Sequence, residues 1–459
     1  MKLSHLTRIA AAALLSTAAL ASAQPVDRAE LDALRAQIQK LEQQVKVLSR
    51  QLEIKDETAA AAAPTTPKIT VSDKGVSLAS ADGANTIKFR GLIQADSRVF
   101  FDDGGIANNA FVLRRARLIT EGTFAKSFGY QFVTEFGGSS VSILDANITT
   151  ALASGVQFKA GKFKVPVGLE LLQSDSWTFF NERSLVTNLV PNRDVGVQLS
   201  GDVWSGRASY ALGAFGGVAD AGSSNNSDFD NDKDVAGRVF FSPFKNDAGS
   251  ALQGLSFGVG GSLGRQKTAN GRASGYRTDG QQVFFTYNSA VVADGAIWRV
   301  SPQFDYRNGS FGLLGEYAVS AVNVRPSATG LKQELQNKAW QLAAGYVLTG
   351  EDSSPAGVAP KADFNWSAGT WGAFEAAVRY AVLNIDDNAF PTFASASSSA
   401  DKAKSLGLGL NWYLSKTVRF TFDYYQTRFG LNALAPAVPS NAVLRQDEKA
   451  FITRFQLSF

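Results

Sequence analysis

The sequence predicts an all-β fold, a transmembrane antiparallel β-barrel of about 16 strands that follows an N-terminal coiled-coil helix. Three observations lead to this fold class. Segments of about ten residues that alternate between apolar and polar side chains recur from Ile69 to the C-terminus. Short polar turns alternate with long connections along the same region. The composition is that of a strand-rich chain, with Gly 42, Phe 32, Tyr 11 and Trp 7.

Residues 1–23 have the features of a secretory signal peptide. A basic start with Lys2 and Arg8 precedes a short apolar stretch, and a small-x-small cleavage site ends at Ala23. An uncleaved anchor helix is the alternative, although the apolar stretch is shorter than the roughly 20 residues of a membrane span. Cleavage would remove His5, the only His of a sequence without Cys. We therefore expect no Ser–His or Cys–His nucleophile, no zinc site, no disulfide, no cofactor and no enzymatic activity.

Residues 24–57 are predicted to form a coiled-coil helix. Apolar side chains recur at spacings of three and four residues, the pattern of a heptad seam, at Leu31, Leu34, Ile38, Leu41, Val45, Leu48 and Leu52. β-branched residues at a and Leu at d favour a dimer, and a single amphipathic helix packed on a domain is the alternative. Residues 58–68, rich in Ala, Pro and Thr, are predicted to be a linker.

The barrel is predicted to span residues 69–459. Within it, the strands on both sides of the Asn308-Gly309 turn carry apolar residues at every second position, as in a β-hairpin. A soluble sandwich or repeat array with one solvated face would show the same alternation. Short turns that alternate with long connections rich in Ser, Asn and Asp favour an outer-membrane barrel, as do aromatic pairs at segment ends such as Trp412-Tyr413.

The C-terminal strand indicates which face would meet lipid. Phe455 and Phe459 lie on one face of an extended strand, and Arg454 and Gln456 lie on the other. An apolar face in lipid and a wet polar face agree with a closed barrel around an aqueous lumen. Both termini would then lie on the periplasmic side, so the strand number should be even.

Net charge indicates little about the lumen, because residues 69–459 carry 36 basic groups (45 minus 9) and 34 acidic groups (41 minus 7). The distribution is more informative. Many acids fall in connections, whereas Arg and Lys recur on the polar strand faces, for example at Arg299, Arg379, Arg419 and Arg454. The lumen is therefore expected to favour anions. Alternatively, these arginines pair with lumen carboxylates and stiffen the wall, and both roles are compatible.

One connection, near residues 164–192, is predicted to fold into the barrel and form its constriction. It is long and apolar, and an exposed acidic loop would not carry Trp177, Phe179 and Phe180. Charges at such a constriction act in a low dielectric, where each of them affects ion passage strongly.

Several segments resemble the phosphate-selective porin O and P family over about residues 88–459, among them "GKFKVPVGLE", "NER", "ILDANI", "FVLRRARL" and "NWYLSKTVRFTFDYY". The resemblance implies a homotrimer of barrels of about sixteen strands in outer-membrane lipid. Each barrel would pass inorganic anions, phosphate among them, through a pore narrowed by an inward loop. It also implies a trimeric coiled coil, against the dimer preference of the seam. No nucleic-acid partner is expected.

By matching motif, Arg115, Arg117, Asp145 and Arg183 are candidates for the constriction. Phosphate-selective members are expected to carry Lys just before the Trp of the inward loop, where this chain has Ser176. The sequence therefore leaves selectivity for phosphate over other anions open. The full set of candidate pore or anion-binding residues is Lys88, Arg90, Arg98, Arg115, Arg117, Asp145, Lys159, Lys162, Lys164, Ser176, Arg183 and Arg207.

The leading hypothesis is an outer-membrane porin for passive, anion-preferring diffusion of phosphate or polyphosphate, with its N-terminal helix in the periplasm of a Gram-negative bacterium. A general anion or small-solute porin without phosphate selectivity is the alternative within the same class. A structural or adhesive outer-membrane barrel is an alternative from another class. An outer-membrane enzyme ranks last, because no His would remain for general-base catalysis.

Overall fold

The computed structural model describes residues 28–62, 66–101, 107–226, 228, 230–268, 271, 273–430 and 447–459. The predicted signal peptide, residues 1–23, lies outside the described residues. The chain divides into two compact units, residues 1–66 and 67–459.

The first unit contains one long helix, α1, which spans Arg28–Ala62. It continues beyond the predicted end at residue 57, because alanine, which fills positions 59–62, is the strongest helix former. The predicted seam is exposed along its length, from 42% at Leu31 to 60% at Leu52. None of the helices in the described part of the chain has the length and apolar character that a membrane crossing requires.

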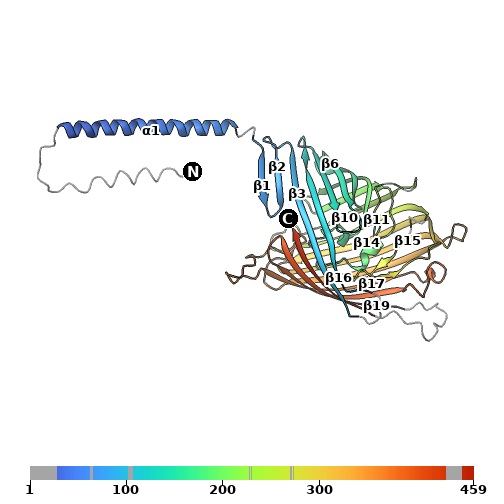
Figure 1. Cartoon of the computed structure of the whole chain (residues 1–459). Helices are drawn as coiled ribbons and strands as arrows, with labels where there is room; N and C mark the ends of the chain where they lie inside the picture. The colour runs from blue at the N-terminus through green and yellow to red at the C-terminus, as the bar shows by residue number, and fades with distance from the viewer. Residues whose placement is uncertain are drawn as a thin grey trace. The chain divides into compact units, whose positions relative to one another are not determined.

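The second unit confirms the predicted fold class, because sixteen antiparallel strands of the described residues close into a barrel (Figure 1). Each strand pairs with the next along the chain, and β20 pairs with β3 to close the ring. The strands are β3 (Thr86–Phe100), β4 (Ala110–Phe124), β5 (Phe128–Glu135), β6 (Ser142–Ala153), β7 (Val156–Lys164), β8 (Arg193–Val203), β9 (Ala208–Phe215), β10 (Asp234–Phe241), β11 (Leu255–Thr268), β14 (Val292–Asn308), β15 (Phe311–Arg325), β16 (Gln333–Val347), β17 (Ala373–Asn384), β18 (Lys402–Tyr413), β19 (Val418–Phe429) and β20 (Glu448–Ser458).

The closing strand has the predicted alternation of faces. Arg454 and Gln456 are buried inside the barrel, whereas Phe455 is 46% exposed on the outside. The backbone of Phe459 exchanges hydrogen bonds of 2.9 and 3.1 Å with Gly91 of β3, so pairing with β3 continues to the last residue. Because the apolar side chains of β20 face outward, lipid is the environment in which this face is stable.

A short hairpin precedes the barrel strands. It consists of β1 (Lys68–Ser72) and β2 (Gly75–Ala79), and β2 pairs with the first residues of β3 (Figure 1). The hairpin extends the sheet beside β3 but does not belong to the closed ring.

The two ends of the barrel differ in their connections. At the short-turn end, adjacent strands are joined by turns such as residues 125–127 and 309–310, with two longer connections at 242–254 and 348–372. At the long-loop end, the connections include residues 165–192, 216–233, 269–291 and 385–401. This asymmetry is typical of outer-membrane barrels.

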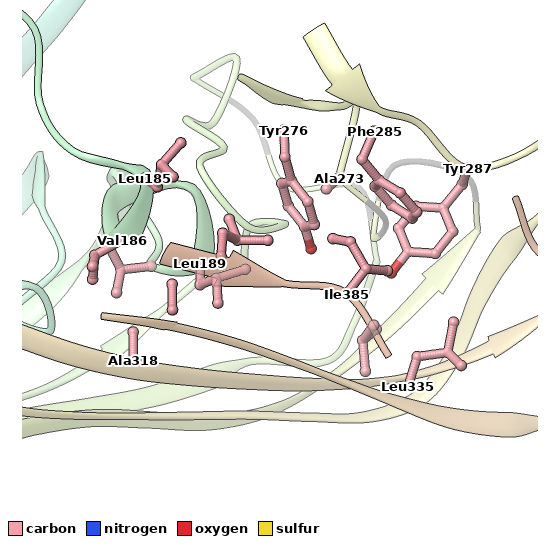
Figure 2. Close-up of a cluster of buried hydrophobic side chains, with 14 of the residues drawn as sticks. Leu185, Val186, Leu189, Ala273, Tyr276, Phe285, Tyr287, Ala318, Leu335 and Ile385 are labelled. Carbon is pink, nitrogen blue, oxygen red and sulfur yellow. The ribbon is translucent and has the colours of Figure 1, made fainter. Parts of the chain in front are cut away.

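One side of the barrel interior is filled by a hydrophobic plug, which the sequence analysis did not predict beyond the inward-folded connection itself. Three connections of the long-loop end meet there, residues 165–192, 269–291 and 385–401. They contain η1 (Leu185–Leu189), β12 (Tyr276–Arg277), β13 (Val283–Phe285) and η3 (Asp387–Ala389). Figure 2 shows Leu185 and Leu189 above the wall residue Ala318, and the rings of Tyr276, Phe285 and Tyr287 grouped together. Alanines on the facing strands leave the volume that these large side chains occupy.

Candidate functional site

The connection between β7 and β8, residues 165–192, lies inside the barrel and is called the inward loop here. It contains a short helix, α2 (Leu169–Leu172), besides η1. Leu185, Val186 and Leu189 are fully buried in the plug. An apolar segment of this length is stable inside the barrel because it exchanges contact with water for contact with the wall.

Glycines in the wall strands make room for the aromatic side chains of the inward loop. A Cβ at Gly345 of β16 would clash with the ring of Phe179, and one at Gly407 or Gly409 of β18 would lie 3.1 Å from the ring of Phe180. Phe180 is 1% exposed, so its ring is seated against the wall. The packing therefore fixes the middle of the inward loop against β16 and β18.

Glu182 of the inward loop binds three arginines of the barrel wall. Its carboxylate accepts hydrogen bonds from Arg114 at 2.6 and 3.0 Å, from Arg454 at 2.9 Å and from Arg98 at 3.3 Å. Burial by itself would raise the pKa of Glu182, but the guanidiniums of Arg114 and Arg454 hold it well below its usual range. Glu182 is therefore an ionised anchor between the loop and the strands β3, β4 and β20.

Arg379 joins the inward loop to a second connection. Its guanidinium lies 3.2 Å from Glu170 of α2 and 2.8 Å from Asp279 of the connection 269–291. It also lies over the ring of Phe180, with its central carbon 4.4 Å from the ring centre. Because Arg379 is 1% exposed and doubly paired, it stiffens the interior and is not a free pore cation.

The same conclusion holds for the other arginines that the sequence suggested on this side of the lumen. Arg299 pairs with Asp220 at 2.7 Å, and Arg454 also pairs with Asp96 at 2.6 Å. Arg419 is fully buried and donates to the backbone oxygen of Thr178 at 3.0 Å. These arginines of strands β14–β20 therefore anchor the wall and the inward loop, which is the alternative role that the sequence left open for them.

Asp175 of the inward loop lies in a cluster of three guanidiniums. Its carboxylate lies 2.5 Å from Arg183 and 3.4 Å from Arg115, and it also pairs with Arg117. Burial would raise the pKa of Asp175, but Arg183, Arg115 and Arg117 hold it well below its usual range. The structure thus brings together three of the sequence-predicted residues around an acid that the sequence reasoning did not single out.

A β-bulge explains why the alternation of side chains in the sequence did not identify Arg114 as a residue of the barrel interior. The pairing of β3 with β4 shifts register between Gln94 and Ala95, which face Arg115 and Leu113, so Arg114 is the extra residue. A strict period of two would turn Arg114 to the lipid side, whereas the bulge lets both Arg114 and Arg115 reach the interior. The run of adjacent arginines in "RRAR" was the available signal, since an arginine in lipid is costly.

A cavity of about 430 Å³ lies between the inward loop and the strands of the short-turn half, and is called the short-turn cavity. Its lining includes the predicted residues Arg90, Arg117, Asp145, Lys159, Lys164 and Ser176. Arg193 and Arg238, which the sequence reasoning did not select, also line it. Basic side chains outnumber the acids Asp145 and Asp175 in this lining.

A second cavity of about 160 Å³ lies on the long-loop side of the inward loop and is called the long-loop cavity. Arg114, Arg115, Arg183 and Arg277 line it together with one acid, Glu182. The cluster around Asp175 lies between the two cavities, because Arg115 and Arg183 line one of them while Arg117 and Asp175 line the other.

Four candidate residues line neither cavity. Lys88 lies 3.6 Å from Glu121 near the start of β3, and Arg98 pairs with Asp96 at 3.0 Å as well as with Glu182. The other two are Lys162 and Arg207.

Lys162 and Arg207 do not belong to the pore wall. Lys162 is paired across the sheet with Ala146 and with Val195, whose side chain is on the outer face, and its amine donates to Ser224 at 2.6 Å. Its register therefore directs it away from the lumen. Arg207 lies in the turn between β8 and β9, not on a strand face, and pairs with Asp247 at 3.0 Å in an exposed position.

The comparisons with known proteins agree with this geometry. The family model of the phosphate-selective porins O and P matches residues 87–459. The chain belongs to this porin family. This confirms the family resemblance that the sequence motifs indicated. A curated relative in the family, Porin O of Pseudomonas aeruginosa, is 25% identical over 420 residues, which cover 84% of this chain and 91% of the relative.

Solved structures share the fold of this porin at low sequence identity. The outer membrane channel DcaP of Acinetobacter baumannii superimposes with a TM-score of 0.53 at 10% identity, covering 82% of this chain and 98% of that one. The trimer form of OmpT of Vibrio cholerae gives a TM-score of 0.50 at 12% identity, covering 82% and 100% of the two chains. Family and fold together identify an outer-membrane porin.

Proposed function

We propose that this porin mediates passive diffusion with a preference for anions, and that it acts as a channel and not as an enzyme. The observation that carries the proposal is the set of basic side chains without an acidic partner. Among the described residues, Lys159, Lys164 and Arg238 in the short-turn cavity and Arg277 in the long-loop cavity have no carboxylate within 4.0 Å. Basic groups without a carboxylate partner on both sides of the inward loop lower the energy of an anion in both cavities.

The permeant class that we propose is small inorganic anions, phosphate among them. The name of the family and that of Porin O support phosphate. The residue before Trp177 argues for weak phosphate binding, because Ser176 contributes a hydroxyl where a lysine would contribute a charge. We therefore place phosphate within a general anion preference, without a tight site for it.

We further propose a homotrimer in outer-membrane lipid with its short-turn end in the periplasm. Short periplasmic turns and long outer connections are the rule for such barrels. The exposed heptad seam of α1 would then lie in the periplasm and join the subunits as a three-stranded coiled coil after removal of residues 1–23. The solved OmpT relative is described as a trimer. The domain limits at residues 24–57, 58–68 and 69–459 remain part of this proposal.

The test is the reversal potential of single channels in a planar bilayer under a chloride gradient. The expected sign is that of anion flow. Lys159→Glu and Lys164→Glu should each reduce the anion-to-cation permeability ratio, whereas Arg207→Glu, an equal charge change at an exposed turn outside both cavities, should leave it unchanged.

A native potential of cation sign would contradict the proposal. Two other results would point to the alternatives. An anion preference with no block by phosphate at any concentration would favour a general anion or small-solute porin. The absence of measurable conductance in a correctly inserted trimer would favour a structural or adhesive barrel.

A further inference from the structure

The cluster around Asp175 contains a carboxylate where a permeating anion would be expected to bind. Arg115, Arg117 and Arg183 converge on this one side chain between the two cavities. Three guanidiniums around one oxyanion form an arrangement that binds carboxylate or phosphate through charge-assisted hydrogen bonds.

The three arginines do not depend on Asp175 for their position. Arg115 donates to Gln94 at 2.6 Å, Arg117 to Glu135 at 2.6 Å, and Arg183 to the backbone oxygen of Gln173 at 2.9 Å. Each guanidinium is therefore held by a second partner and would stay in place if the carboxylate were replaced.

The backbone of the inward loop at this point is also held independently of the carboxylate. Gln94 donates to the backbone oxygen of Asp175 at 3.0 Å, and Gln456 donates to that of Ser176 at 3.0 Å. The anchors at Glu182 and in the plug lie elsewhere in the loop. The Asp175 carboxylate is thus not the only contact that holds the loop at this point.

We propose that Asp175 is a specificity-determining residue whose carboxylate acts as a tethered substitute for the permeating anion. It occupies the oxyanion site formed by Arg115, Arg117 and Arg183, and a phosphate ion must compete with it in order to bind there. The carboxylate keeps anion binding weak, so that an anion entering the site is also released. This inference rests on the proposed function and names the residue that would set the strength of anion binding in the pore.

The experiment compares native trimers with two neutral variants, Asp175→Asn and Asp175→Ser, and with the charge-retaining Asp175→Glu. Chloride conductance is titrated with phosphate for each protein. We expect the neutral variants to be half-blocked at a phosphate concentration at least fivefold lower than the native protein, and Asp175→Glu to remain within twofold of the native value. Asp247→Asn, the same charge change at the exposed partner of Arg207, should behave as the native protein does.

Three outcomes would overturn the inference. Neutral variants with native phosphate block would show that Asp175 does not occupy the anion site. Neutral variants with a larger conductance and a lower anion preference would show that the carboxylate holds the loop. An equal shift in Asp145→Asn, which removes an acid of the short-turn cavity outside the cluster, would show that only the summed charge matters. A native reversal potential of cation sign would instead refute the proposed function, so the two failures are distinguishable.

Discussion

Replacing Glu182 by Gln tests whether buried ion pairs hold the inward loop in place. The substitution keeps the size of the side chain and removes the charge that Arg114, Arg98 and Arg454 share. Arg98 and Arg454 retain Asp96 as a partner, at 3.0 and 2.6 Å, whereas Arg114 keeps no other carboxylate among the described residues.

The size of the effect follows from this difference. Removing one partner of a buried ion pair costs about 3–5 kcal/mol, and the retained Asp96 places Glu182→Gln near the lower limit. A cost of about 3 kcal/mol raises the population of detached loops by roughly two orders of magnitude, since each 1.4 kcal/mol is tenfold.

The assay uses a single cysteine, because the natural sequence has none. Ser184 lies two positions after Glu182 and is 1% exposed, so Ser184→Cys should react slowly with a water-soluble thiol reagent until the loop detaches. The labelling rate should rise about a hundredfold when Glu182→Gln is added, and single-channel current should become noisier. Glu135→Gln is the matched control, because it removes a carboxylate that pairs with Arg117 on the wall. Labelling within twofold of the Ser184→Cys protein would refute the assignment of Glu182 as an anchor.

Three further predictions concern assembly, selectivity and the plug. Deleting residues 26–57 should leave folded, conducting trimers that dissociate at a lower temperature in gel-shift assays. Recovery of monomers alone would show that the barrels do not hold the trimer together. Ser176→Lys should strengthen phosphate block of chloride current at least several-fold, because one charge-assisted contact contributes roughly 1.5–3 kcal/mol. An unchanged titration would show that Ser176 does not lie on the path of the anion. The side chain of Phe285 has 0% exposure and contacts Tyr276 and Phe390, so Phe285→Ala should lower the free energy of unfolding by about 3–5 kcal/mol in urea titrations. A loss below about 1 kcal/mol would mean that the plug relaxes around the gap.

The sequence by itself determined the properties that depend on neighbours along the chain. A period of two places Phe455 outside and Arg454 inside whatever the rest of the protein does, because successive side chains of a strand point to opposite faces. The exclusion of an exposed position for Trp177, Phe179 and Phe180 likewise followed from their apolar character. Strand alternation, closure of the barrel and the family could therefore be predicted from the sequence.

The tertiary structure alone decided what each polar strand face meets. Arg454 resembles a pore residue in sequence, yet Glu182, 272 positions earlier in the chain, pairs with it and neutralises its charge. The bulge that turns Arg114 inward likewise depends on the register of two strands. The plug depends on contacts among three separate connections. Local patterns carry no information on such pairings, because the energy of a buried charge depends on which distant groups surround it. For that reason the sequence predicted a lumen rich in arginine, and only the fold separated the arginines that anchor the inward loop from the basic groups that face the cavities.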